Sequence, residues 1–420
     1  MAEGRAEERT GVARGIAIVA TLDTKGPEVR FLAAEIHSRG HPPVVVDVSL
    51  QPHHERIPAA SNGLLSREEV ARRAGVDPDA LPRMPRAEAI EAMGRGAGSI
   101  LLELWNAERI SGVLGIGGNQ GTALASLAMR HLSLGTPRLI VSTVASGNLR
   151  PYLQHHDIAV LFPLADLTGG PNRVTLPILR RAAAAICAMV ESASPVPRGD
   201  SPAVAITALG NTHPVVSETI RLLKERGMEP VVFHASGACG AAMEELVEAG
   251  MFAGVLDLTP HELLGEVFGE DIYSPTRAGR LLGGAGRVPR VVAPGGLEFF
   301  VFGPQESIPA RFRDRPTHMH NPFNANVRAT REEMAILGEE VARRLNASGG
   351  RAAFLLPLRG WTVVAGPGGP LYDPEGNKAF AQALRAHLAP EVRLVEVDAE
   401  LNDPKCAALA VALLEDLMQP

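Results

Sequence analysis

Short apolar runs without polar interruptions alternate with longer amphipathic segments along the chain. The first run, Ile16–Ala20, is followed by a polar segment, a helical pattern that Gly40 ends, and a second run, Val44–Val46. Fully apolar runs of this length are typical of strands in a parallel sheet, because helices cover both faces of such a sheet. The pattern therefore predicts a strand–helix–strand unit, in which Pro27 suits the first turn of the helix.

The same pattern returns in the second half, where Val204–Ala208 is the first apolar run. Three landmarks recur at a constant offset of 187 residues (214 − 27 = 187). They are the pairs Pro27 and Pro214, Gly40 and Gly227, and Pro43 and Pro230. The recurrence predicts two halves built alike, although strand–helix–strand units resemble one another in any case.

Further apolar runs extend the alternation of strands and helices through both halves. A long helical pattern covers 87–107, whereas 52–87 has no sustained period and predicts loops and short helices. Strands are also predicted at 255–258, 290–293 and 352–356. This alternation predicts doubly wound sheets, in which ligands bind at the carboxyl ends of the strands.

A linker rich in proline, glycine and serine, Ser192–Pro202, separates the two halves. At 420 residues the chain is too long for one ordinary core. We therefore predict an α/β protein with two Rossmann-like doubly wound domains, residues 1–194 and 195–420, each with a mostly parallel sheet.

Two glycine-rich loops, Gly115–Thr122 and His234–Gly240, follow predicted strands and open into predicted helices. Glycines let a ligand approach the backbone, and a helix N-terminus offers unpaired N–H groups. Both loops therefore predict anion sites, most often for phosphate, although a tight strand-to-helix turn needs the same glycines. The first loop is not a P-loop, and Gln120 stands where the dinucleotide fingerprint has its third glycine. The candidate residues are Gly117, Gly118, Asn119, Gln120, Gly121 and Thr122 for a nucleotide, and Ser236, Gly237, Cys239 and Gly240 for a substrate.

Polar residues at the ends of two other predicted strands add to the nucleotide site. Asp23 and Lys25, with Thr24 between them, offer a carboxylate for Mg²⁺ and a cation for phosphate, or form an ordinary solvated loop. A second group offers hydroxyls for phosphate oxygens or Mg²⁺, or else caps a helix. This second group is Ser142, Thr143 and Ser146, followed by Gly147.

The second half offers candidates for substrate binding. His318 and His320 alternate on a predicted strand and share a face, but two histidines without a third ligand do not define a metal site, and we expect none. We expect His320 and Asn321 to contact the substrate or to be structural. Arg359 follows a strand and is placed to clamp a carboxylate or phosphate, or to form a surface ion pair. Cys239 lies at a predicted helix start, where a thiol can serve as a nucleophile, but no His–Asp partner is indicated, so catalytic residues stay unassigned.

Composition excludes several classes of function. Hydrophobic residues make up 45% of the chain and charged residues 21%, which is typical of a folded protein. The net charge of −6 and the aromatic content of 4% disfavour nucleic acid and anionic membranes as partners. The N-terminus is charged rather than apolar, no apolar stretch reaches about 18 residues, and the three cysteines lie far apart. We therefore expect a cytoplasmic protein with reduced thiols.

The chain resembles the ATP-binding family related to the N-terminal region of the tomato mosaic virus resistance protein, from about Ile16 to Leu414. The matching landmarks are Thr21–Gly26, Gly115–Thr122, Val141–Gly147, Phe233–Gly237, His320–Pro322, Tyr372–Glu375 and Asn402–Pro404. The chain departs from the family pattern at Ala365, where a carboxylate is usual, and within Gly210–Pro214 and Ser236–Gly240.

The resemblance implies two Rossmann-like domains, ATP binding and self-association into a homo-oligomer. It also implies a barrel domain that some relatives carry and that would here be a separate partner protein. Two functions follow as hypotheses. In the first, the protein is an ATP-dependent enzyme, with Mg²⁺, that acts on a small anionic metabolite in a cleft between its domains. In the second, it is a non-catalytic module that binds a protein in response to ATP.

Overall fold

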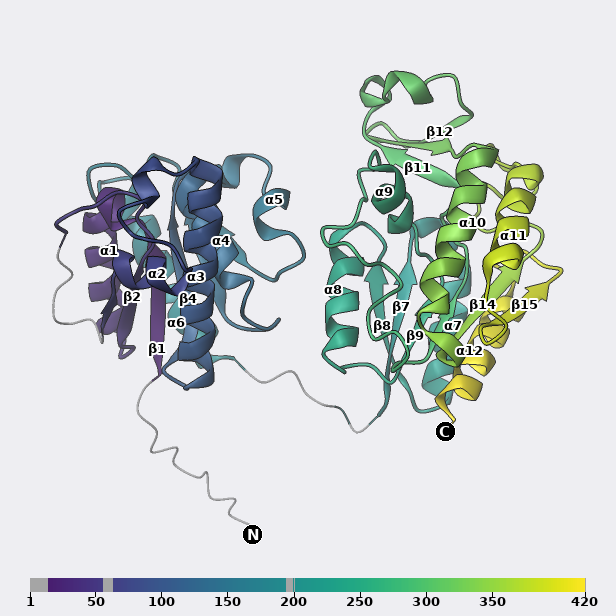
Figure 1. Cartoon of the computed structure of the whole chain (residues 1–420), viewed down its shortest axis with the longest axis horizontal. Helices are drawn as coiled ribbons and strands as arrows, with labels where there is room; N and C mark the ends of the chain where they lie inside the picture. Colours follow the sequence, from purple (N-terminus) through teal and green to yellow (C-terminus); the bar gives the residue numbers. More distant parts are fainter. Residues whose placement is uncertain (1–13, 56–62, 194–198, 200, 420) are drawn as a thin grey trace, which may run out of the picture. The chain divides into compact units, whose positions relative to one another are not determined.

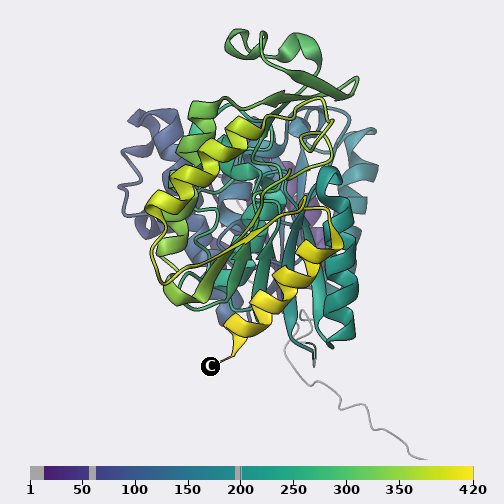
Figure 2. The same cartoon turned by 90° about the vertical axis from the view of Figure 1, so that its right-hand side faces the viewer.

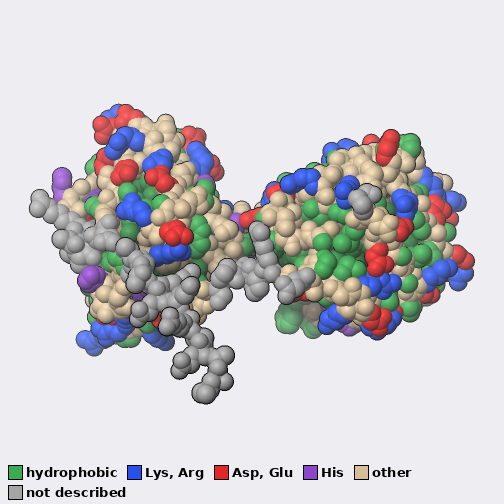
Figure 3. Space-filling view, turned by 90° about the horizontal axis from the view of Figure 1, so that it is seen from below, with side chains coloured by type: hydrophobic (Ala, Val, Ile, Leu, Met, Phe, Trp, Pro, Cys, Tyr) green, Lys and Arg blue, Asp and Glu red, His purple; other side chains and the backbone are tan. Residues whose placement is uncertain are grey.

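The computed structural model describes residues 14–55, 63–193, 199 and 201–419. The chain divides into two compact units, Met1–Pro197 and Arg198–Pro420. Each unit has a six-stranded parallel sheet with helices on both faces, so the predicted fold class is confirmed (Figure 1). No helix in the described ranges has the length and apolarity needed to cross a membrane. On the face shown in Figure 3, side chains of both charge signs are interspersed over each unit.

The N-terminal sheet has the strand order β3-β2-β1-β4-β5-β6, which is the order of Rossmann folds. Its strands are β1 (Gly15–Ala20), β2 (Pro43–Asp47), β3 (Leu64–Leu65), β4 (Ile110–Gly117), β5 (Arg138–Ser142) and β6 (Ala159–Leu161). Its helices are α1 (Leu22–His37), α2 (Arg67–Arg73), α3 (Arg86–Asn106), α4 (Asn119–Met129), α5 (Arg150–Leu153) and α6 (Thr175–Glu191), with the 3₁₀ turns η1 (Leu81–Arg83) and η2 (Thr143–Ser146).

Alternate residues of each central strand serve the two faces of this sheet. On β1, Ile16 and Ile18 pack under α1 and α6, whereas Ala17 and Val19 pack under α2, α3 and α4. All four side chains are 0% exposed. The continuous apolar run in the sequence therefore reflects burial on both faces.

Two helices begin earlier than the sequence pattern predicts. Helix α1 starts at Leu22, not at Pro27, because the Lys25 N–H donates to Thr21 O and closes the first turn. Pro27 lies inside this helix, where its fixed φ fits and only one backbone hydrogen bond is lost. Helix α4 likewise starts at Asn119. The predicted binding loops are thus largely the first turns of helices.

The C-terminal sheet has the order β15-β14-β10-β9-β7-β8. Its strands are β7 (Ala203–Ala208), β8 (Glu229–His234), β9 (Gly254–Asp257), β10 (Arg290–Val292), β14 (Ala352–Pro357) and β15 (Arg393–Val397). Its helices are α7 (His213–Glu225), α8 (Ala238–Glu248), α9 (Glu262–Phe268), α10 (Arg331–Asn346), α11 (Pro374–His387) and α12 (Pro404–Met418), with the 3₁₀ turns η3 (Gly210–Thr212), η4 (Gln305–Ser307), η5 (Ala310–Phe312) and η6 (Gly349–Arg351).

The two halves share the order of five strands, because β2-β1-β4-β5-β6 in the first sheet corresponds to β8-β7-β9-β10-β14 in the second. In the first half the third strand, β3, adds beyond β2, whereas in the second half β9 adds on the other side of β7. The second half also contains an antiparallel sheet of β11 (Phe299–Phe302), β13 (Asn324–Arg328) and β12 (Thr317–Asn321), which projects from the unit (Figure 2). The two halves therefore differ in the edge strands β3 and β15 and in the antiparallel sheet, not in the order of the strands between them.

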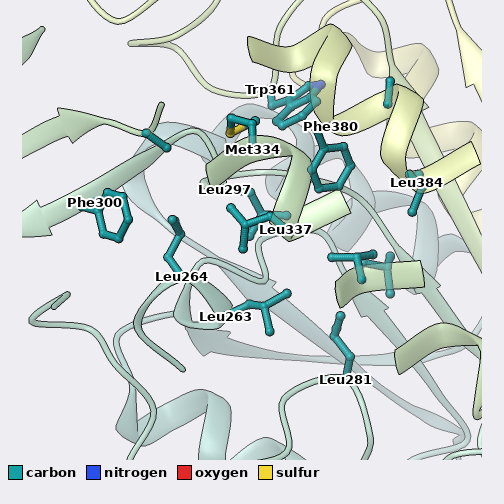
Figure 4. Close-up of a cluster of buried hydrophobic side chains, with 14 of the residues drawn as sticks. Leu263, Leu264, Leu281, Leu297, Phe300, Met334, Leu337, Trp361, Phe380 and Leu384 are labelled. Atoms are coloured by element: carbon teal, nitrogen blue, oxygen red, sulfur yellow. The ribbon is translucent and has the colours of Figure 1, made fainter. Parts of the chain in front are cut away.

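One large core of the second unit lies between its sheet and the helices α10 and α11 (Figure 4). Trp361 and Phe380 meet edge to face, with 5.0 Å between their ring centroids. The Trp361 indole N–H donates to Pro357 O at 2.9 Å, so its polar atom is satisfied inside the core. This packing fixes the loop that follows β14.

A buried ionic network joins α8, β9, α9 and β10 in the same unit. The Arg280 guanidinium is 0% exposed and donates to the carboxylates of Glu244, Asp257 and Glu262. Arg290 donates to Glu244 as well, at 2.7 Å. Removing one cation from such a network leaves buried carboxylates without compensation.

We expect Arg280→Ala to lower the free energy of unfolding of the C-terminal unit by about 3–5 kcal/mol. The matched control is Arg277→Ala, because Arg277 forms an exposed ion pair with Glu248 and should contribute less than about 1 kcal/mol. Trp361 fluorescence during urea unfolding, in a Trp105→Phe background, reports this unit alone. Equal losses in the two variants would contradict the role of the network.

Candidate functional site

A pocket of about 400 Å³ opens at the carboxyl ends of β1 and β4 in the N-terminal unit. These neighbouring strands are the point at which the strand order reverses, where open α/β sheets bind ligands. Fifteen residues line it: Thr21, Asp23, Thr24, Lys25, Leu50, Gln51, Leu81, Pro82, Met84, Arg86, Ala89, Gly118, Asn119, Gln120 and Gly121. The structure thus brings together the predicted groups around Asp23 and around Gly118.

Helix α4 presents an open N-terminus to this pocket. Its N-cap, Gly118, has no side-chain cap, and its first turn contains no acidic residue. The first intrahelical bond is donated by the Thr122 N–H to Gly118 O, at 2.8 Å. Within the described residues, the N–H groups of Asn119, Gln120 and Gly121 have no acceptor. Such N–H groups and the helix dipole favour an anion.

The glycines of this loop differ in whether the packing of the fold requires a residue without a side chain. A Cβ at Gly117 would lie 2.6 Å from Gly121 Cα, and one at Gly121 would lie 3.0 Å from Ile116 O. These two glycines let α4 pack closely on β4. A Cβ at Gly118 would meet only Thr143 Oγ1, at an ordinary 3.5 Å, and its φ is −81°. The packing of the fold does not require glycine at 118, whereas a ligand at the open N-terminus would.

Two cations reach the pocket from two other helices. Lys25, in the first turn of α1, is 9% exposed, and its Nζ donates to Thr24 O at 3.4 Å. Within the described ranges, no carboxylate forms an ion pair with Lys25. Arg86 is the first residue of α3 and donates to the Gln120 side chain. The positive charge of Lys25 is therefore left for a bound anion.

The carboxyl group of Asp23 also lines this pocket, where its negatively charged form is disfavoured. Burial raises the pKa of this carboxyl, and the nearby Asp47 carboxylate raises it further. Its Oδ1 is buried and has no hydrogen-bond partner in the described part of the chain. A cation or a hydroxyl donor from a ligand would relieve this cost.

Asp47, at the end of β2, bonds to the start of α1, which lines the pocket. The sequence does not predict Asp47 as a site residue. Its Oδ1 accepts the N–H of Leu22 at 3.3 Å and that of Ser49 at 3.0 Å, and its Oδ2 lies 2.6 Å from His53 Nε2. The Glu55 N–H donates to His53 Nδ1, so Nε2 carries the proton given to Asp47. Asp47 is therefore a scaffold that holds the start of α1.

An apolar wall completes the pocket. It is formed by Leu50, Leu81, Pro82, Met84 and Ala89. Leu81, Pro82 and Met84 come from the segment 52–87, for which the sequence predicts only loops and short helices, whereas Ala89 belongs to α3. The one sequence signal near them is the Pro82–Arg86 stretch before the long helix, which marks a helix start without indicating a ligand.

The hydroxyl residues predicted after β5 differ in their surroundings: Ser142 caps a 3₁₀ turn, and Ser146 is exposed. Ser142 is 0% exposed, lies 2.6 Å from Thr122 Oγ1, and accepts the Val144 N–H. The capping alternative therefore describes Ser142, and Thr122 is its buried partner. Ser146 and Gly147 are exposed, and neither they nor Thr143 line the pocket.

The second glycine loop does not offer an open anion site, contrary to the sequence prediction. Glu262 Oε1 accepts the N–H groups of Gly237 and Gly240 at 2.9 and 3.1 Å. A Cβ at Gly240 would lie 2.2 Å from that oxygen. The carboxylate of Glu262 thus takes the place of a phosphate at the start of α8, and the glycines are needed for its approach. Ser236 and Cys239 flank these N–H groups, and Cys239 is an exposed free thiol.

A second, smaller pocket of about 80 Å³ lies in the C-terminal unit. Its lining includes His320, as predicted for a substrate contact, and also His234, which ends β8. Asn321 and Arg359 do not line it. The full lining is Leu209, Gly210, Asn211, His234, Tyr273, Phe299, Val301, His320, Asn324 and Asn326.

Arg359 forms an exposed ion pair, with Nε and Nη2 at 2.7 and 2.8 Å from the two Asp398 oxygens. This arrangement is the surface alternative for that residue. Asn321 lies in the hairpin between β12 and β13, where its Oδ1 accepts the Phe323 N–H. Arg359 is thus paired with the loop that follows β15, and Asn321 with the turn of its own hairpin.

Comparison with known proteins places the chain in a family. The model of the N-terminal domain of the Uncharacterised protein family (UPF0261) matches residues 14–195, and that of the C-terminal domain matches 201–418. The chain belongs to the UPF0261 family. A UPF0261 protein of Clostridium tetani is 34% identical over 96% of this chain and 99% of its own length.

The ToMV susceptible protein tm-1(GCR26) of Solanum lycopersicum is 32% identical over 87% of this chain and 50% of its own length. The link to the tomato protein is thus confirmed for about half of that protein. Among solved structures, MurG of Acinetobacter baumannii aligns with 97% of this chain and 91% of its own, at 14% identity and a TM-score of 0.22. At that TM-score the likeness carries no argument.

We expect Asp23→Asn to stabilise this UPF0261 protein at pH 7, by up to about 1 kcal/mol, since functional groups often cost stability. The raised pKa means that the folded state disfavours the Asp23 charge. The gain should therefore shrink as pH falls through the folded pKa of Asp23 and vanish near the unfolded value of 3.8, where the wild-type carboxyl is also neutral.

The matched variant Asp47→Asn should destabilise the N-terminal unit, because it weakens the bonds from Leu22, Ser49 and His53. Calorimetric unfolding of the two variants and the wild type between pH 4 and 7 makes the comparison. A loss of stability in Asp23→Asn would contradict the cost assigned to its charge.

Proposed function

We propose that the N-terminal unit binds ATP with Mg²⁺ in the 400 Å³ pocket. The observation that carries the proposal is the open N-terminus of α4, whose Gly118 lies beside a buried Lys25 without a carboxylate partner in the described residues. An anion with several negative charges is the ligand that this arrangement favours. The resemblance to an ATP-binding family supports the same nucleotide.

In this proposal the pocket divides between phosphates and base. The N–H groups at Asn119, Gln120 and Gly121 and the cations of Lys25 and Arg86 hold phosphate oxygens. The apolar wall around Leu50 and Met84 takes the nucleobase, as apolar walls do in most small-molecule sites.

The oxygen donors at the start of α1 fit Mg²⁺. This ion binds through one or two carboxylates together with substrate phosphates and water. Asp23 supplies a carboxylate with a free buried oxygen, and the hydroxyls of Thr21 and Thr24 lie beside it, 2.9 Å apart. The ion would neutralise phosphate charge and remove the cost of the Asp23 charge.

We propose further that the nucleotide serves an enzyme that acts on a small anionic metabolite. The alternative is a non-catalytic module that binds a protein in response to ATP. This alternative is supported by the name of the tomato relative, ToMV susceptible protein, which refers to a virus and to no reaction. Self-association and a separate barrel-domain partner are proposals that rest on the family resemblance.

Gly118→Val should weaken ATP binding at least about tenfold, because its side chain would stand where phosphate approaches the backbone. The substitution should leave the fold intact, since a Cβ there meets no atom closer than 3.5 Å and a weaker N-cap costs at most about 1 kcal/mol. Isothermal titration calorimetry with Mg²⁺–ATP measures the affinity. Unchanged affinity in the folded variant would refute the placement of the phosphates.

Lys25→Ala should also weaken ATP binding, whereas Lys224→Ala, at the exposed end of α7, should not. Asp23→Asn should reduce the difference between affinities measured with Mg²⁺ and with EDTA. If Mg²⁺ strengthens binding equally in this variant and the wild type, then Asp23 does not hold the ion.

Turnover separates the two functions. Release of ADP that depends on an added metabolite supports the enzyme. Binding of a protein that requires ATP, with no ADP formed, supports the non-catalytic module. Gly118→Val serves as the control in both assays, because either function needs the nucleotide.

A further inference from the structure

The pocket of about 80 Å³ in the C-terminal unit gathers polar side chains from separate elements. They are Asn211 of η3, His234 at the end of β8, Tyr273 of the segment after α9, His320 of β12, and Asn324 and Asn326 of β13. The first two lie at the carboxyl ends of β7 and β8. The antiparallel sheet supplies the opposite wall, so its insertion creates the pocket.

Asn326 is the most deeply buried polar residue that lines the pocket. The residue as a whole is only 4% exposed, and its side chain lines the pocket without being sealed into the core. His234 and His320 have side chains without a hydrogen bond to any described residue. Three polar side chains, of which His234 and His320 are exposed, thus line one small space and can bond to a ligand there.

The lack of charged side chains in the lining limits the chemical classes of ligand that the pocket can bind. Among the described residues that line this pocket there is no lysine, arginine, aspartate or glutamate. An anion or an amine would therefore lack a direct counter-charge. Amide and imidazole groups both donate and accept hydrogen bonds, as a hydroxyl group does. The rings of Tyr273 and Phe299 offer apolar surface for the carbon atoms of such a ligand.

A buried ion pair lies behind the pocket and fixes its aromatic wall. His261 and Asp271 are both buried, with His261 Nε2 3.2 Å from Asp271 Oδ2. Burial alone would lower the pKa of His261, but Asp271 and the bond to Gly296 O raise it overall. Asp271 also accepts the Tyr273 N–H at 2.6 Å, and the Tyr273 ring meets His261 edge to face.

His261 in turn affects the pKa of His234. Burial and the positive charge of His261 lower the pKa of His234. His234 is therefore neutral at pH 7, and one of its ring nitrogens is free to accept a proton from a hydrogen-bond donor. Tyr273 stands between the two histidines, with its ring centroid 6.3 Å from that of His234.

We propose that this pocket binds the hydroxyl groups of a small polyol or of the polyol end of a larger metabolite. His234 accepts a hydrogen bond from one hydroxyl, and His320 and Asn326 bind its neighbours. The site lies entirely within the C-terminal unit, so the proposal does not depend on nucleotide binding by the other unit.

The test uses the full chain with ¹⁵N-labelled histidine. Glycerol and erythritol are added as probes, and inorganic phosphate is added at the same concentrations. We expect the polyols, but not phosphate, to shift the imidazole signals of His234 and His320. His234→Ala and His320→Ala should each weaken the response to erythritol about tenfold, which corresponds to one or two lost hydrogen bonds.

His318→Ala is the matched control, because His318 lies on the same strand as His320 but does not line the pocket. His234 and His320 are both exposed enough for substitution without loss of the core. The proposal is overturned if neither polyol shifts the two signals, if phosphate shifts them as strongly, or if His318→Ala weakens the response as much as His320→Ala.

Discussion

A helix that follows a parallel strand leaves its first N–H groups without partners, and they all point to the same edge of the sheet. How each unit meets this need decides what its edge can bind. In the C-terminal unit, Glu262 accepts the N–H groups of Gly237 and Gly240 and is itself held by Arg280. At α4 of the N-terminal unit, the described residues supply no such carboxylate. The same strand–glycine–helix pattern therefore closes one site and leaves the other open.

The acidic residue at the end of β2 adds a second constraint. In dinucleotide-binding folds with this strand order, a carboxylate at that place binds the ribose. Here the Asp47 carboxylate is used by Leu22, Ser49 and His53, and it is 2% exposed. A ligand of the pocket must therefore be held mainly through α4, Lys25 and Arg86. This favours recognition through phosphates over recognition through a ribose.

The sequence predicts the strands well because burial on both faces leaves continuous apolar runs, as at Ile16–Ala20. It also brings Asp23, Lys25 and Gly118 to one site, because neighbouring parallel strands end at one edge. It cannot show that Arg86 and Met84 complete the pocket, since their segment has no period that fixes its place. Nor can it show that Glu262 fills the second glycine loop. Glu262 lies 25 positions after Gly237 and 22 after Gly240, and only tertiary packing brings them together.

The glycines of the two loops differ in whether the fold alone explains them. Gly117 and Gly121 allow close packing of α4 on β4, and Gly240 allows the approach of Glu262. Each is explained by the fold, and none by itself indicates a ligand. Gly118 differs because neither its φ nor its neighbours require a glycine. A glycine becomes evidence for binding only when the surrounding structure would accept a side chain. By that criterion the case for an anion rests on Gly118 and the unpaired charge beside it.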